Sequence, residues 1–160
     1  MTNIASNLQA VSKEIHTAAA HAKRTASSLQ LLAVSKTFSA AEVRAAYLAG
    51  QTCFAENYLQ EALDKIAALQ DLPLEWHFIG PIQSNKTRLI AENFAWVHSV
   101  DRLKIAERLS AQRPLNLPPL QICLQVNISD EASKSGVASG EAGALALQLA
   151  RLPNLTLRGL

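Results

Sequence analysis

The chain has 160 residues, of which 49% are apolar and 18% are charged. This composition is typical of a chain that buries a core and argues against disorder, so we expect one globular domain over residues 1–160. The 15 basic and 13 acidic residues leave a net charge of +2. Because this charge is small and scattered along the sequence, nucleic acid is excluded as an expected partner.

The two cysteines, Cys53 and Cys123, each lie in an apolar run, without a Cys or His nearby at the spacing of metal ligands. We expect both to be buried, reduced thiols, and no metal site is predicted. The sequence shows no signal-peptide pattern and no run of the roughly 18 apolar residues that a membrane helix needs. A cytoplasmic protein without a membrane partner is the expectation.

The first elements in chain order are a helix, a buried strand and a second helix. Apolar residues at helical spacing predict a helix that ends near residue 24: Ile4, Leu8, Val11 and Ile15. The continuous apolar run Leu31–Val34 is typical of a strand covered on both faces. Ser39 and Glu42 form a capping-box pattern, which predicts a helix that ends at Gly50.

The same alternation continues to the end of the chain. Strands are predicted at Thr52–Ala55, Leu74–Ile79, Ala95–Ser99, Leu120–Val126 and Leu155–Leu160. Helices are predicted at Tyr58–Leu69, from near Ser84, after a cap at Asp101, and at Gly140–Leu152. This succession of strand-helix units predicts an α/β fold with a parallel sheet. Periodicity leaves open a doubly wound sheet and a (β/α) barrel of the TIM type, although no G-x-G-x-x-G turn follows the first strand.

Polar residues at the carboxyl ends of the strands are the candidates for function, because ligands bind there in parallel α/β folds. They are Lys36, Glu56, Asn57, His77, His98 and Asn127. Lys36 closes the first strand, where partial desolvation would favour the neutral amine that attacks an aldehyde. Taken alone, a lysine at a strand end more often extends into solvent.

The other candidates each have a structural alternative. Asn57 precedes a predicted helix, so its side chain suits both the helix N-cap and a ligand. His77 lies among large apolar residues, where a hydrogen-bonded core histidine is more common than a binding residue. Amides near Ser84–Lys86 could face an anion, but capping is the commoner outcome. Glu56 and Glu61 lie too near a helix start to predict an acid and base pair.

Four segments carry a specific pattern. They are Leu32-Ala33-Val34-Ser35-Lys36-Thr37, Glu56-Asn57-Tyr58-x-Gln60-Glu61, Trp76-His77-Phe78-Ile79-Gly80-Pro81-Ile82-Gln83-Ser84-Asn85-Lys86 and Asn127-Ile128-Ser129-Asp130-Glu131-x-x-Lys134-Ser135-Gly136. With them, the whole chain closely resembles the pyridoxal phosphate homeostasis protein family. This resemblance favours a ligand role for Lys36 over a solvent-exposed lysine.

The resemblance implies a barrel similar to the N-terminal domain of alanine racemase, with pyridoxal 5'-phosphate (PLP) held as a Schiff base on Lys36. It also implies a role in intracellular vitamin B6 homeostasis without turnover, so the chain is not expected to be an enzyme. Asn57 is expected to line the ring pocket, His77 to support its floor, and Lys134 to match a lysine suspected of a secondary reaction. PLP-dependent apoenzymes are the protein partners that this role suggests.

Two departures from the family pattern matter. Ala55 stands where the family usually has glycine, which predicts a mild local adjustment. Family members continue past Leu160 with the last strands and the segments that hold the phosphate and the pyridine nitrogen. We therefore expect an incomplete barrel with about six of eight strand-helix units, roughly the N-terminal two thirds. Its open edge strands favour self-association and its cofactor binding should be weak, whereas the full-length form should be a monomer.

Two rival interpretations remain. One is a PLP-dependent enzyme similar to an amino acid racemase, which needs a second acid or base group. Tyr47 and Tyr58 are the tyrosines of the sequence, and both lie near the ends of predicted helices. The other is a fragment that binds no cofactor and only associates through its open edges.

Overall fold

Helices and strands alternate along the chain in the computed structural model, which describes residues 3–129, 131 and 133–160. The helices are α1 (Ile4–His21), α2 (Ala40–Leu48), α3 (Leu59–Ala68), α4 (Thr87–Asn93), α5 (Leu103–Gln112) and α6 (Ala142–Leu149), with 3-10 turns η1 (Ala26–Ser28) and η2 (Ser139–Glu141). The strands are β1 (Ala33–Val34), β2 (Cys53–Glu56), β3 (Glu75–Phe78), β4 (Trp96–Val100), β5 (Leu120–Leu124), β6 (Val126–Asn127), β7 (Val137–Ala138) and β8 (Leu155–Gly159).

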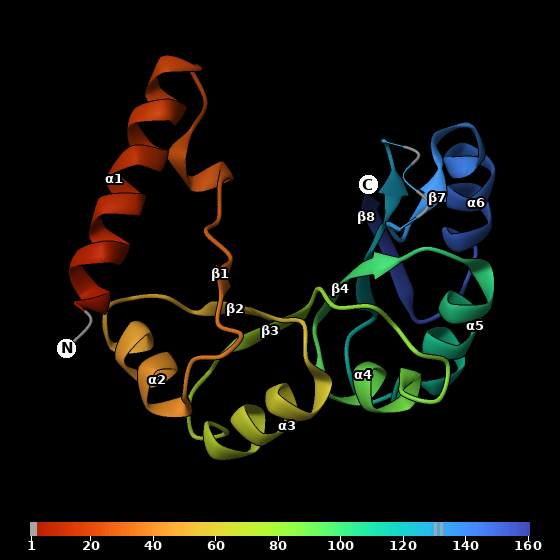
Figure 1. Cartoon of the computed structure of the whole chain (residues 1–160), viewed down its shortest axis with the longest axis horizontal. Helices are drawn as coiled ribbons and strands as arrows, with labels where there is room; N and C mark the ends of the chain where they lie inside the picture. Colours follow the sequence, from red (N-terminus) through yellow and green to blue (C-terminus); the bar gives the residue numbers. More distant parts are fainter. Residues whose placement is uncertain (1–2, 130, 132) are drawn as a thin grey trace.

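The main sheet has six parallel strands in the order β1-β2-β3-β4-β5-β8. It is open, with β1 and β8 at opposite ends and helices α2 to α5 following one another along its outer side (Figure 1). The predicted parallel α/β arrangement is confirmed. Since β1 and β8 each pair with a single neighbour, the expected edge strands are also confirmed.

The two faces of the sheet differ in chemistry. The outer face, which packs against the helices, carries apolar side chains that are almost fully buried, among them Phe54, Trp76, Val97 and Ile122. The opposite face, here called the inner face, carries Cys53, Ala55, Glu75, His77, Trp96, His98, Gln121, Cys123 and Arg158, as the strand register requires. The core therefore lies between the sheet and its helices, and the polar groups gather on the inner face.

Local sequence signals explain how the first strand-helix units begin and end. The capping box at the start of α2 is confirmed, because the Glu42 carboxylate accepts from the Ser39 amide at 2.7 Å and the Ser39 hydroxyl accepts from the Glu42 amide at 3.3 Å. Gly50 follows α2 with a φ of 100°, a conformation that glycine adopts without strain.

Several predicted boundaries are wrong. Asp101 does not cap α5; the N-cap is Arg102, whose extended backbone offers its carbonyl to Ile105 while Asp101 accepts from the Arg102 guanidinium. The predicted strand Leu120–Val126 is divided, since β5 ends at Leu124 and β6 pairs with β7 in a separate two-stranded sheet. Helix α6 is shorter than predicted because its first turn is the 3-10 turn η2.

The cysteines and the helices agree in part with the sequence-based expectations. Cys53 and Cys123 are free thiols, and Cys53 is buried while Cys123 is half-buried. Burial raises the pKa of both thiols, so the protonated form is favoured. Within the described residues, the helices are all too short or too polar to cross a bilayer.

Open edges predict association of the chain with itself. We expect the apparent size in gel filtration to rise with protein concentration, because an unpaired edge strand can pair with another chain. Val34 on edge strand β1 is 48% exposed, and Val34→Lys should shift the protein towards the monomer. Leu89→Lys, at a 38% exposed apolar site on α4 in the middle of the helical layer, is the control and should not. A concentration-independent monomer would contradict this expectation.

Candidate functional site

Lys36 lies in a tight turn directly after β1. The Phe38 amide donates to the Ser35 carbonyl at 3.1 Å, which closes the turn, and Thr37 has a φ of 68°. The side chain of Lys36 is exposed. The sequence predicted that this amine is partly desolvated. That prediction is wrong, because Lys36 lies in a turn after an edge strand and not within the sheet.

Asn57 leaves the neighbouring strand at the same end of the sheet. Val34 pairs with Ala55, and the Ser35 amide donates to the Ala55 carbonyl at 2.9 Å. Lys36 and Asn57 each come two residues after the Val34 and Ala55 pair, so both follow the carboxyl ends of the neighbouring strands β1 and β2. Both residues therefore lie at this edge of the sheet, and a shared role of their side chains in binding stays a prediction.

The side chain of Asn57 does not cap a helix. The N-cap of α3 is Tyr58, whose extended backbone accepts from the Ala62 amide, and its side chain makes no cap bond. Among the described residues, the Asn57 Oδ1 is buried and has no hydrogen-bond partner. The helix-cap alternative is therefore wrong, and the Asn57 amide remains available to a ligand.

Gly80 brings the end of β3 against Asn57. A Cβ atom on Gly80 would lie 2.1 Å from the carbonyl oxygen of Asn57, a separation that only glycine avoids. The Gly80 carbonyl in turn accepts from the Ser99 hydroxyl at 2.5 Å. These contacts link the carboxyl ends of β2, β3 and β4 and fix the backbone of Asn57.

His77 lies on the inner face, opposite Ala55 and therefore below the level of Asn57. Its Nδ1 is 2.9 Å from the His98 Nε2, its Nε2 is 3.0 Å from the Glu75 Oε1, and its ring stacks on Trp96 with centroids 5.4 Å apart. Burial lowers the pKa of His77, against the opposing effect of Glu75, and burial lowers that of His98 as well. These contacts agree with the interpretation of His77 as a hydrogen-bonded core histidine. Its role beneath a bound cofactor stays a prediction.

Cys53, Glu75 and His77 form a group whose donor atoms all lie within 4.8 Å of one another, and such a set could hold a metal ion. Existing contacts already account for its geometry, because the Cys53 thiol lies 3.5 Å from the Glu75 carboxylate that His77 contacts. The raised pKa of Cys53 also disfavours the thiolate that a metal would need. We therefore assign these three residues a structural role in the hydrogen bonding of the inner face, and not a metal site.

The most densely connected polar cluster at this edge was missed in the sequence. The Lys65 ammonium donates to the Ser35 carbonyl at 2.6 Å, to Glu56 at 2.7 Å and to Glu61 at 2.6 Å. Lys65 is only 5% exposed. Its position in the sequence could have indicated this burial. Lys65 lies one turn after Ala62 and one turn before Leu69, on the side of α3 that faces the sheet, where an apolar residue is expected.

The remaining candidates have structural roles or stay untested. Asn127 donates to the backbone carbonyls of Glu131 and Lys134, so it organises its own loop. Helix α4 starts at Thr87, later than predicted, with Lys86 as an N-cap that makes no side-chain cap bond. This short helix gives no support to an anion site at Ser84–Lys86.

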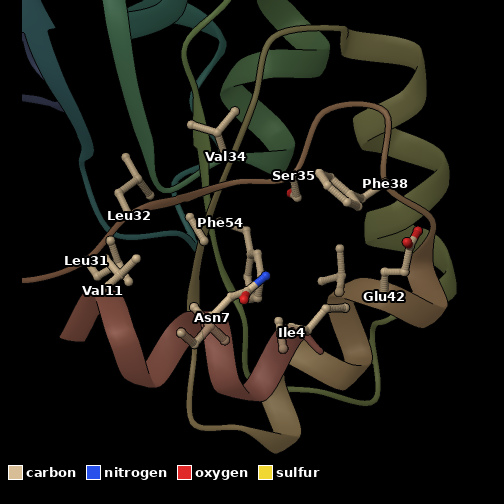
Figure 2. A pocket seen from close by; sticks show the side chains of 14 residues that line it. Ile4, Asn7, Val11, Leu31, Leu32, Val34, Ser35, Phe38, Glu42 and Phe54 are labelled. Carbon is tan, nitrogen blue, oxygen red and sulfur yellow. The ribbon is translucent and has the colours of Figure 1, made fainter. Parts of the chain in front are cut away.

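An apolar cavity of about 400 Å³ lies beside this edge, between α1, β1 and α2 (Figure 2). Ser35 and Phe38, on either side of the Lys36 turn, border it, but Lys36 does not line it. The side chains around it are almost all apolar, so the cavity offers little to a phosphate or a ring nitrogen. It is not the site that the polar residues define.

Comparison with known proteins identifies the family. The model of the alanine racemase N-terminal domain family matches residues 2–160. A pyridoxal phosphate homeostasis protein from Pseudomonas aeruginosa is 64% identical over 160 residues, a match that covers 100% of this chain and 70% of the relative. One from Escherichia coli K12 is 53% identical over 163 residues, with the same coverage. The chain belongs to the pyridoxal phosphate homeostasis protein family. The resemblance seen in the sequence is confirmed.

Solved structures support the same family. PipY from Synechococcus elongatus, solved with PLP bound, superposes with a TM-score of 0.77 at 41% identity, covering 91% of this chain and 68% of PipY. Alanine racemase from Corynebacterium glutamicum gives a TM-score of 0.59 at 15% identity, covering 79% of this chain and 36% of the racemase, which shows the fold alone. The prediction of an incomplete alanine racemase type barrel is confirmed.

Substitution of Gly80 tests the contact that fixes Asn57 in this member of the pyridoxal phosphate homeostasis protein family. Gly80→Ala should lower the free energy of unfolding by about 1–3 kcal/mol, because the new methyl meets backbone that cannot rotate away. Gly143→Ala on α6, where a Cβ atom meets nothing within 4 Å, is the control and should not destabilise. Denaturant unfolding of both variants measures the difference, and equal stabilities would contradict the close approach.

The two inner-face histidines predict a loss of stability in mild acid. Their lowered pKa values mean that the unfolded chain binds protons more readily, so the free energy of unfolding should fall as the pH drops below about 6.5. His98→Gln keeps a hydrogen-bonding side chain but does not titrate, so its decline should be shallower. Denaturant unfolding across this pH range tests the point, and identical slopes would oppose it.

Proposed function

We propose that this chain binds PLP at the carboxyl ends of β1 and β2, with the Lys36 amine joined to the cofactor aldehyde as a Schiff base. The single observation that carries the proposal is that Lys36 follows β1 where Asn57, whose buried Oδ1 lacks a partner within the described residues, follows the neighbouring strand β2. The PLP-bound PipY structure and the names of the curated relatives support the choice of cofactor.

The side chains at this edge fit such a group. PLP supplies an aldehyde that condenses with a primary amine, and Lys36 presents an exposed amine at the mouth of the sheet. Asn57 offers an amide to the polar substituents of the ring. Below them, His77 stacks on Trp96 and hydrogen-bonds His98, a rigid aromatic floor suited to a flat ligand.

A binding role without turnover fits the arrangement better than racemisation. A racemase needs a second acid or base beside the cofactor, and the two tyrosines belong to the helical layer, with Tyr47 in α2 and Tyr58 at the N-cap of α3. We therefore propose a role in intracellular PLP homeostasis in the cytoplasm, with PLP-dependent apoenzymes as recipients of the cofactor.

Covalent labelling tests the cofactor lysine. After incubation with PLP and reduction with borohydride, peptide mapping should find the label on Lys36, and Lys36→Ala should lose both the label and the visible absorbance of the Schiff base. Lys134→Ala removes the lysine of the suspected secondary reaction and is the matched control; it should keep the label on Lys36.

Two outcomes would overturn this proposal. One is an unlabelled Lys36 in the folded wild-type protein, which would remove the assigned site. The other is exchange of an amino acid α-proton with solvent at an enzymatic rate in the presence of PLP, which would favour the racemase-like alternative.

A further inference from the structure

The two peptide groups that flank Lys36 are both held by side chains of α3. The Ser35 carbonyl, before the lysine, accepts from the Lys65 ammonium at 2.6 Å. The Thr37 amide, after the lysine, donates to the Glu61 carboxylate at 2.6 Å. Lys65 and Glu61 are themselves 2.6 Å apart, so these contacts close a ring around Lys36.

We propose that Lys65 and Glu61 are positioning residues that hold the turn of Lys36 so that its amine meets the aldehyde of PLP. The inference rests on the proposed function, since it concerns the same lysine. Neither residue needs to touch the cofactor, because both act through the backbone on either side of Lys36.

The orientation of the Lys36 side chain depends on its backbone, because the side chain itself is exposed. Among the described residues, the Lys36 amine has no hydrogen bond and no ion pair, and the side chain is exposed. The direction in which its Cα–Cβ bond leaves the chain is then set by the turn alone. Fixing the two adjoining peptide groups is the means by which the fold can aim this amine.

The turn needs such support because Thr37 has a φ of 68°. A β-branched residue rarely adopts this left-handed conformation, and it persists where surrounding contacts enforce it. The bond from its amide to Glu61 is the contact that does so. Without an acceptor at this position, Thr37 is free to return to a negative φ, which would rotate the adjoining Lys36.

The anchor beneath the turn is rigid because Lys65 is buried and each of its ammonium donors is paired. Lys65 is 5% exposed and its three donors meet three acceptors. Glu56 is 0% exposed, and its Oε1 accepts from Lys65 at 2.7 Å and from the Ser35 hydroxyl at 2.6 Å, while its Oε2 has no partner among the described residues. Removing either Lys65 or Glu56 would leave the charge of the other buried, which stabilises the observed pairing of these two residues, whereas loss of Glu61 leaves Lys65 paired with Glu56 and the Ser35 carbonyl. The hydrogen bond from Lys65 lowers the pKa of Glu61, helped by the Thr37 amide.

Glu61 gives the sharper test, because its side chain is 32% exposed and its loss should leave the fold intact. In Glu61→Ala the rate of covalent labelling of Lys36 by PLP should fall about 10-fold. Glu61→Gln retains an acceptor for the Thr37 amide and should stay within about threefold of wild type. Both variants remove the same charge, so a difference between them reports the hydrogen bond. Asp64→Ala, on the same helix, is the control and should match wild type.

A second measurement is independent of the cofactor. In the protein without PLP, the Thr37 amide should be protected from hydrogen exchange, and Glu61→Ala should speed its exchange at least about 10-fold while α3 and β2 stay protected. Lys65→Met removes the anchor itself and should expose the Thr37 amide in the same way wherever the variant folds.

The outcomes separate the two proposals. Wild-type labelling at Lys36 with an unchanged rate in Glu61→Ala would overturn the positioning role and leave the cofactor site standing. An unlabelled Lys36 in wild type would overturn the proposed function; the exchange of Thr37 would then still decide whether Glu61 holds the turn. A Thr37 amide as fast in wild type as in Glu61→Ala would refute the positioning role outright.

Discussion

The buried contact between Lys65, Glu56 and the Ser35 carbonyl is the interaction on which this edge of the protein depends. Strand β1 has only Ala33 and Val34 in register with β2, and it lies at the end of the sheet. Such a short ladder is weak by itself. The charged cluster adds three bonds from α3 and β2 to the residues that follow β1, and so ties the edge to the helical layer.

The contrast between the two faces of the sheet explains why function gathers where it does. Apart from Glu56, which Lys65 of α3 contacts, the outer face is largely apolar and is covered by helices, which provides the hydrophobic stabilisation of the fold. The inner face carries stacked aromatic rings, thiols and an arginine whose guanidinium lies 5.6 Å from the Trp96 ring centre. Polar groups there satisfy one another, and Asn57 is left with an unused acceptor at the rim.

Sequence patterns predicted the order and type of the main elements because each strand-helix unit has its own apolar run, turn residues and caps. They failed where a choice depended on tertiary contacts. Asn57 could be a cap or a ligand by sequence, and only the extended backbone of Tyr58 shows that the cap lies one residue later. Asp101 was misjudged for the same reason.

The candidate site was predicted only in part. Lys36 and Asn57 could be proposed from the sequence because ligands bind at strand ends in a parallel sheet, a rule that needs no side-chain detail. Lys65 was not found, because a lysine in an amphipathic helix is ordinarily solvated. Its burial follows from two carboxylates and a carbonyl that come from other elements, and their convergence cannot be read from the spacing of residues along one helix.

The bonds that tie the turn of Lys36 to β2 and α3 all join residues within positions 35–65. Ser35, at the start of the cluster, and Lys65, at its end, are separated by 30 positions, and Asn57 lies between them. These residues belong to one continuous segment of the chain, β1-α2-β2-α3. During synthesis, its parts leave the ribosome before β3 to β8 exist, so the scaffold of the lysine could assemble while translation continues.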